Sequence, residues 1–402
     1  MTALEPLELA LGMVLGQDTC SAAPALDAPR PLTALERPIL AALRRSPCLV
    51  SFSGGRDSSA VLALAVRLAR REGLPDPIPA TIRASEAPAA DEASWQELVV
   101  ARLGLSDWLR LEVRDELDVV GPVAQRVLRR HGLLWPFNAH FHLPLLEAAR
   151  GGALLTGIGG DELFNAATSR RPAAVLAGRV RPVRRDVRRI VLHVAPAPFR
   201  RWWHRRDDAM AYSWLTPEAA DAARREYAHA QVAEPRRMRP RLRHVRAARY
   251  LRVGTASLER LAAEAGTALE HPLLDRGVWA AVSRWAPRGG YLGRDDAMRD
   301  VFGDLLPAAL HGRRDKACFD EVFFHHHSRR FAAAWTAGGV PPGLVDAGAL
   351  RAEWRAPAPR AQSFTLLQAA WLASAGDGAD EPPAGLAQRV PTARAPQSEH
   401  RQ

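Results

Sequence analysis

Lysine is almost absent from this chain of 402 residues. Its 55 lysine and arginine residues include a single lysine, Lys316. Arginine carries its charge on a planar fork, whereas lysine is a compact ammonium whose pKa responds to its surroundings. The composition indicates that arginine has replaced lysine wherever a positive charge suffices, so Lys316 marks either a site that requires an ammonium group or a surviving surface lysine.

Cysteine and long hydrophobic runs are also scarce. The three cysteines, Cys20, Cys48 and Cys318, are odd in number and show no C-x-x-C spacing, which argues against a disulfide framework and a zinc site. No window reaches the ~18 to 20 apolar residues of a membrane span, and the N-terminus lacks a signal-peptide pattern. We therefore expect a cytoplasmic protein with reduced thiols and no membrane partner.

The remaining composition is that of a folded, basic protein. Hydrophobic residues make up 47%, charged residues 25%, and the formal net charge is +11. A chain of this length and composition can bury a substantial core, which excludes disorder as the overall description.

Strand-like and helical patterns alternate from residue 37 onward. Strand-like runs occupy 48–53, 77–84, 108–113 and 153–158, and helical spacing occupies 37–46, 60–73, 91–105 and 143–152. This alternation predicts an α/β fold, a parallel sheet with helices on both faces, followed by a mainly α-helical C-terminal half.

The domain organisation follows from shifts in composition. We expect a helical lead-in over 1–36, a main domain over 37–330 with an Arg-rich helical insertion at 170–249, a helical segment over 331–374 and a disordered tail over 375–402.

The first chemical motif is SGGRDSS at 53–59, between a predicted strand and a predicted helix. Adjacent glycines let the backbone approach a phosphate, and the helix start adds amide donors and a positive dipole end. The spacing is neither that of a Walker A loop nor G-x-G-x-x-G. An ordinary turn without a ligand is the alternative. The phosphate-binding candidates here are Ser53, Gly54, Gly55, Asp57, Ser58 and Ser59.

The second motif is TGIGGDELF at 156–164, where a buried strand ends. Its candidates are Gly159, Gly160 and Asp161. The carboxyl ends of parallel strands meet at one edge of a sheet, so Asp57 and Asp161 can share a metal ion there. One or two carboxylates together with phosphate oxygens are typical ligands of Mg²⁺.

These motifs, with GTALEHPLLD at 266–275 and RDKACF at 314–319, resemble those of the asparagine synthetase-like ATP pyrophosphatases. That family includes asparagine synthetase, β-lactam synthetase and the lasso-peptide cyclases. The resemblance covers about 37–330. The spacing before Pro272 is shorter than in the family's E-x-x-x-P-x-x-D segment, which makes Glu270 a less direct match than the others.

The resemblance implies an ATP-dependent, AMP-forming ligase. ATP would bind with Mg²⁺, a substrate carboxylate would form an acyl-adenylate with release of pyrophosphate, and an amine would displace AMP. Lys316 would stabilise the charge that develops in these steps. Glu270 would orient or deprotonate the amine, and the alternative is a salt-bridged glutamate without that role.

The chain also departs from the glutamine-dependent members. Thr2 stands where those members carry a catalytic cysteine, and about 36 residues replace their amidotransferase domain. We therefore expect the amine to come from ammonia, a partner or the substrate itself, and intramolecular lactam or macrolactam closure fits this expectation. Arg56, in place of the usual aliphatic residue, either adds to the phosphate-binding charge or faces solvent.

Two further features lie outside these motifs. Between 170 and 206 the insertion carries twelve arginines together with Trp202 and Trp203. It is either a docking surface for an acidic peptide, an acyl-carrier protein or nucleic acid, or a solvated helical face. The three histidines at 325–327 suggest a metal site, but consecutive residues on a helix point in different directions, which favours a surface cluster.

Two other functions remain as alternatives. The net charge of +11 would suit a tRNA-modifying ATP pyrophosphatase. The TGIGGDELF and RDKACF segments argue against that reading, so we expect no nucleic-acid partner. A non-catalytic nucleotide-binding subunit is the second alternative, and retention of Asp57, Asp161 and Lys316 argues against it.

Overall fold

The structure is a computed structural model that describes residues 4–18, 27–84, 87, 92–165, 170–287, 290–311 and 319–375. Lys316, Cys20, Cys318 and the predicted tail from 376 onward lie outside these residues. Within the described parts of the chain, no helix is long and apolar enough to cross a bilayer.

Five parallel strands form one sheet in the order β3-β2-β1-β4-β5. The strands are β1 (Cys48–Ser51), β2 (Ile78–Ala84), β3 (Leu109–Val113), β4 (Ala153–Leu155) and β5 (Ala268–Glu270). The central strands β1 and β4 are short apolar runs, as expected for strands covered on both faces. The predicted α/β fold with a parallel sheet is confirmed, and β5 adds an edge strand that the sequence patterns did not indicate.

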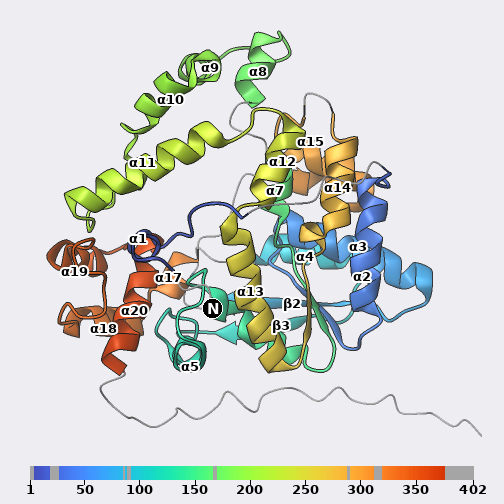
Figure 1. Ribbon diagram of the computed structural model, residues 1–402. Helices are drawn as coiled ribbons and strands as arrows, with labels where there is room; N and C mark the ends of the chain where they lie inside the picture. The colour runs from blue at the N-terminus through green and yellow to red at the C-terminus, as the bar shows by residue number, and fades with distance from the viewer. Residues whose placement is uncertain are drawn as a thin grey trace, which may run out of the picture.

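Helices cover both faces of the sheet (Figure 1). One face carries α2 (Pro31–Leu43), α3 (Arg56–Glu72), α4 (Ala93–Leu103), α14 (Arg276–Trp285) and α15 (Arg294–Phe302). The other carries α5 (Pro122–His131), α6 (Leu143–Ala148) and α13 (Arg249–Ala265). Each layer has its own hydrophobic core against the sheet.

A third core lies beside the sheet and joins the first and last of the described helices. It contains α1 (Pro6–Leu11), α11 (Pro217–Ala233), α17 (Asp320–Phe323), α18 (His326–Ala334), α19 (Ala347–Arg355) and α20 (Phe364–Ala375). Trp214 and Trp354 are fully buried in it. The buried carboxylate of Glu8 in α1 pairs with Arg249 of α13, so the N-terminal segment is part of the packed molecule.

The described part of the Arg-rich insertion is helical and extends away from the sheet. Its first three helices, α8 (Arg170–Leu176), α9 (Asp186–Val194) and α10 (Ala197–His204), form an arm alongside α11 (Figure 1). The chain returns to the sheet through α12 (Met238–Arg246). Two short helices complete the α-helices described, α7 (Gly160–Phe164) and α16 (Ala308–His311).

Cys48 lies at the start of β1 and is a free, buried cysteine. Burial raises the pKa of its thiol to about 12, so the group stays protonated at neutral pH. An inert structural thiol agrees with the expectation from the sequence.

Candidate active site

The site lies between β1 and β4. From β1 the chain adds β2 and β3 on one side, and it then adds β4 and β5 on the other side. Val50 of β1 pairs with Leu155 of β4, and the two strands end side by side. β2 and β3 continue the sheet on one side of this point and β5 on the other. Open parallel sheets bind ligands in the crevice outside the carboxyl ends of strands at such a switch point. Both glycine motifs follow these two strands, so the structure brings them together as predicted.

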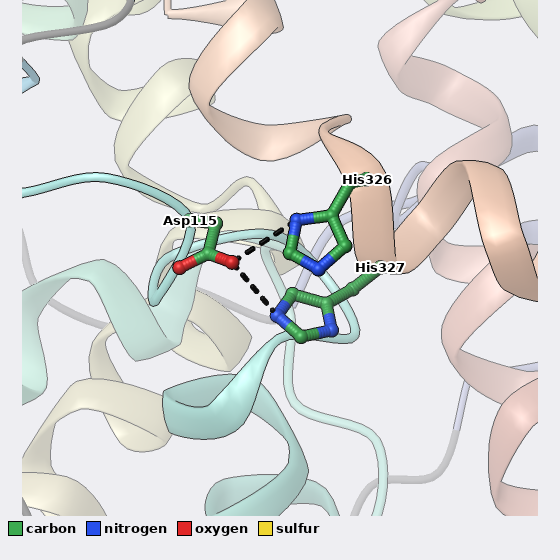
Figure 2. A group of neighbouring side chains, drawn as sticks. All are labelled: Asp115, His326 and His327. Atoms are coloured by element: carbon green, nitrogen blue, oxygen red, sulfur yellow. Dashed lines mark ion pairs between the residues drawn. The ribbon is translucent and has the colours of Figure 1, made fainter.

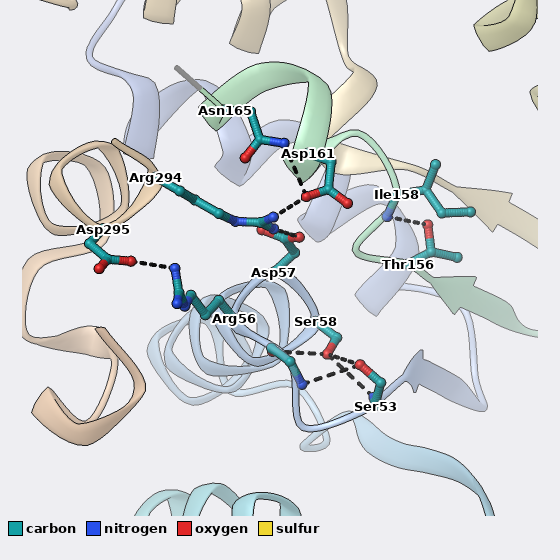
Figure 3. Close-up of polar contacts among 11 residues, drawn as sticks. Ser53, Arg56, Asp57, Ser58, Thr156, Ile158, Asp161, Asn165, Arg294 and Asp295 are labelled. Atoms are coloured by element: carbon teal, nitrogen blue, oxygen red, sulfur yellow. Dashed lines mark hydrogen bonds and ion pairs between the residues drawn. The ribbon is translucent and has the colours of Figure 1, made fainter. Parts of the chain in front are cut away.

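The first glycine loop is held by its own serines. The Ser53 hydroxyl accepts a hydrogen bond from the Gly55 amide at 3.2 Å and lies 3.1 Å from the Ser58 hydroxyl (Figure 3). Gly54 has φ of +78°, a left-handed conformation that L side chains rarely adopt. Because α3 begins at Arg56, the positive end of its dipole lies at this loop.

The second loop packs directly against the first. A Cβ atom on Gly160 would lie 2.2 Å from the Asp57 carboxyl carbon, so only glycine fits there without displacing Asp57. Asp161 is the next residue, on the first turn of α7. The carboxylates of Asp57 and Asp161 thus reach the same space from two different loops.

Arg294 joins these two carboxylates. The guanidinium of this α15 residue forms ion pairs with both Asp57 and Asp161 (Figure 3). The Asp57 side chain is only 17% exposed, and a buried carboxylate needs a neighbouring positive charge. Since one cationic group already contacts both carboxylates, a single Mg²⁺ ion can also be held between them, and the residues fit that ion.

A cavity of about 600 Å³ opens beside this cluster. Its walls include Ser53, Gly55, Arg56, Asp57, Ser58, Glu92, Phe141, His142, Thr156, Gly157, Ile158, Gly159, Asp161, Glu162, Arg294 and Phe319. Its volume is within the range of small-molecule and nucleotide sites. The glycine loops contribute polar groups to its walls, and Phe141 and Phe319 add apolar surface.

Glu162 and Tyr250 form a pair that the sequence patterns did not reveal. The Tyr250 hydroxyl donates a hydrogen bond to the Glu162 carboxylate at 3.3 Å. Burial raises the pKa of Glu162, and the neighbouring Asp161 adds to this effect. Burial likewise raises the pKa of Tyr250, so its hydroxyl remains a donor at neutral pH. A cavity carboxylate with a raised pKa is suited to accept a proton.

Two neutral histidines belong to the site: His142 lines the cavity, and His271 contacts Thr156 of the second motif. His271 Nδ1 is 2.6 Å from the Thr156 hydroxyl, and Thr156 lines the cavity. Burial lowers the pKa of His142 and His271 to about 4 each. Both imidazoles are therefore uncharged at neutral pH, and His271 lies within hydrogen-bonding distance of the Thr156 hydroxyl.

Glu270 ends the edge strand β5 and is not among the residues that line the cavity. Its backbone carbonyl accepts a hydrogen bond from the Thr156 amide at 3.1 Å. Its side chain shares a charged environment with Asp275, Arg45 and Arg37, and its pKa is raised mainly by burial. The structure therefore does not bring Glu270 to the other site residues, and its role with the amine stays a prediction.

The other predicted residues differ in position. Ser59 is fully buried in α3 and does not line the cavity. Arg56 lines the cavity and pairs with Asp295 of α15, so it does not simply face solvent. Lys316 lies outside the described residues, but Phe319, in the same RDKACF segment, lines the cavity.

Arg294 is the main residue that sequence reasoning missed. It is one of many arginines in a helical pattern, and nothing in that pattern separates it from a surface arginine. Only the packing of α15 against α7 shows that its side chain reaches both aspartates.

Comparison with known proteins gives one assignment. No curated protein matches the chain. The Asparagine synthase family matches residues 40–374, which include both glycine loops, α15 and the arm. The chemistry of this family is ATP-dependent adenylation and amide formation. Because the match spans most of the sequence, the chain belongs to the asparagine synthase family.

Proposed function

We propose that this protein is an AMP-forming ligase that activates a carboxylate with ATP and joins it to an amine. The observation that carries the proposal is the meeting of Asp57 and Asp161 on one cationic group beside two glycine loops. Such an arrangement suits a triphosphate with its metal ion.

In the first step, a carboxylate oxygen of the substrate attacks the α-phosphorus of ATP. The bond from that phosphorus to the oxygen bridging to the β-phosphate breaks, and pyrophosphate leaves. The loop from Ser53 to Ser58 would bind the phosphates, and Arg294 would lie beside the departing pyrophosphate. Asp57 and Asp161 would hold Mg²⁺, which neutralises phosphate charge when bound.

In the second step, the amine nitrogen attacks the acyl carbon, and the bond from that carbon to AMP breaks. The amine must lose one proton. Glu162 lines the cavity and has a raised pKa, which makes it a second candidate for the proton acceptor, in addition to the predicted Glu270. Lys316, on the segment that leads to Phe319, remains our candidate for stabilising the developing charge.

The arm supports a peptide or a carrier-bound acyl group as substrate. A groove of about 750 Å³ on it is lined by Pro198, Arg201, Trp202, Arg205, Arg206, Asp221 and Arg224. Val187 and Val194 of α9, another helix of the arm, are 64% and 63% exposed. Positive charge next to exposed apolar side chains fits an acidic, amphipathic peptide or carrier protein. Closure of a lactam or macrolactam within such a substrate needs no separate amine donor.

The test is pyrophosphate release by purified protein with ATP and Mg²⁺, alone and with pools of carboxylates and peptides. We expect substrate-dependent release that disappears when Mg²⁺ is chelated. Asp57→Ala should reduce it about 10³-fold or more, since it removes a metal ligand. Asp76→Ala is the matched control, because Asp76 is a surface carboxylate paired with Arg70. Lys316→Arg should retain ATP binding and lose amide formation.

Normal ATP binding without pyrophosphate release in every pool would contradict the proposal and favour a non-catalytic nucleotide-binding subunit. Equal rates in the Asp57→Ala and Asp76→Ala variants would contradict the assignment of the metal site.

A further inference from the structure

We propose that Asp115, His326 and His327 form a binding site for a divalent transition-metal ion of the zinc type. This site is separate from the carboxylate pair of the candidate active site and does not depend on the proposed reaction. It uses two imidazoles and one carboxylate, a donor set that suits zinc and its neighbours and is unlike the oxygen ligands preferred by Mg²⁺.

Three ligand atoms already converge. His326 Nδ1 lies 3.0 Å and His327 Nε2 lies 3.1 Å from the same oxygen of Asp115, and the ligand atoms all lie within 4.8 Å of one another (Figure 2). A tetrahedral zinc ion with bonds of about 2.0–2.1 Å holds neighbouring ligand atoms about 3.3–3.4 Å apart. Small side-chain movements would therefore admit the ion.

The local backbone explains how two consecutive histidines reach one carboxylate, where the helical pattern predicted divergence. They open the first turn of α18, and His325 before them is extended with φ of −106° and ψ of −150°. His326 presents its near nitrogen, Nδ1, and His327 presents its far nitrogen, Nε2. The two side chains leave the helix in different directions, but because they use different ring nitrogens, both reach the Asp115 carboxylate.

Asp118 holds the start of α18 against the loop that carries Asp115. Its carboxylate is fully buried and accepts hydrogen bonds from the His325 amide at 2.8 Å, the Ser328 amide at 3.0 Å and the Ser328 hydroxyl at 2.5 Å. The loop that carries Asp115 is thereby attached to the helix that carries both histidines. Rigid outer contacts of this kind orient metal ligands.

The three ligand side chains differ in their exposure to solvent. The side chain of His327 is 17% exposed, that of Asp115 27% and that of His326 54%. His327 Nδ1 is buried and has no hydrogen-bond partner among the described residues. An ion can thus enter from the His326 side and keep water as its fourth ligand.

Metal binding here would join two segments beside the active-site cavity. Asp115 follows β3, and α18 follows the segment from Phe319 to Phe323. The Val119 amide already donates to the Phe323 carbonyl at 2.9 Å. Since Phe319 lines the cavity, the ion would hold a cavity wall against the sheet.

The experiment measures Zn²⁺ binding by calorimetry on full-length protein freed of any polyhistidine tag, with Mg²⁺ as the comparison ion. We expect one Zn²⁺ ion per chain, a rise in Tm with Zn²⁺, and visible absorption of a four-coordinate complex with Co²⁺. Asp115→Asn and His326→Gln should each weaken Zn²⁺ binding at least tenfold. His325→Gln is the matched control in the same tract.

His326 is the most exposed ligand, so His326→Gln is the variant most certain to fold. Failure of the wild-type protein to bind Zn²⁺ would overturn the proposal, as would equal binding in the His325→Gln and His326→Gln variants. Because every readout is binding or stability, a negative result here leaves the proposed ligase activity standing, and a loss of that activity leaves this site standing.

Discussion

Single residues decide the charge balance of the candidate active site. Asp57 and Asp161 would repel each other and a triphosphate, and the Arg294 guanidinium compensates both carboxylates. Burial works against the positive charge of Arg294, but the two aspartates outweigh it and raise its pKa. If Mg²⁺ bound to both carboxylates, Arg294 would be free to pair with phosphate oxygens.

The proton acceptor of the second step can be identified by comparing two glutamates. We expect Glu162→Gln to slow amide formation by about 10²–10⁴-fold, the usual contribution of a general base. Pyrophosphate release should change far less. If Glu270 holds the predicted role instead, Glu270→Gln will show the loss. Glu259→Gln, an exposed position on α13, is the control.

The pH dependence follows from the raised pKa of Glu162. A general base must be ionised, so amide formation should fall as pH drops through that pKa, at a higher pH than for an ordinary glutamate. The Glu162→Gln variant should lack this acid limb. An unchanged limb in the variant, measured by initial rates across pH, would exclude Glu162 as the acceptor.

At the scale of elements, two strand ends and the loops after them define the site. Parallel pairing of β1 with β4 places the loops side by side, and the glycines let them approach closely. The start of α7 lies against the Asp57 side chain because residue 160 has no Cβ.

Gly160→Ala tests this contact. The added Cβ would lie 2.2 Å from the Asp57 carboxyl carbon, so Asp57 must move. We expect about a 10²-fold loss of pyrophosphate release, the usual effect of small misplacements, and a loss of about 1–3 kcal/mol in the free energy of unfolding. The control is Gly338→Ala, where the new methyl group meets open space. Wild-type rates in Gly160→Ala would show that Asp57 is not held by this contact.

At the scale of the whole molecule, the arm and the sheet have different surfaces. The sheet domain buries most of its large apolar side chains, whereas α9 and α10 leave valines, Phe199 and Trp202 exposed among arginines. The guanidinium of Arg206 lies 3.8 Å from the centre of the Trp202 ring. An acidic partner of the kind proposed above would bind on this arm, which extends away from the sheet (Figure 1).

Substitution of two arginines in the groove tests the docking role. Arg201→Ala with Arg224→Ala should raise the KM of an acidic peptide substrate about tenfold, equal to about 1.4 kcal/mol, with kcat little changed. Added salt should reduce the difference between variant and wild type. Arg67→Ala with Arg102→Ala removes the same charge from exposed sites on α3 and α4. Equal KM values in both double variants would assign the arginines to a solvated face.

The sequence by itself determined the parallel α/β fold, the helical second half and the two glycine loops that meet at the carboxyl ends of β1 and β4. These features depend on local periodicity and on the general geometry of parallel sheets, both of which are readable along the chain. Only the tertiary structure decided that Arg294 joins the two aspartates, that Tyr250 pairs with Glu162, and that Asp115 meets His326 and His327. Each of these contacts joins residues far apart in sequence, so it depends on how helices pack and in which direction individual side chains point.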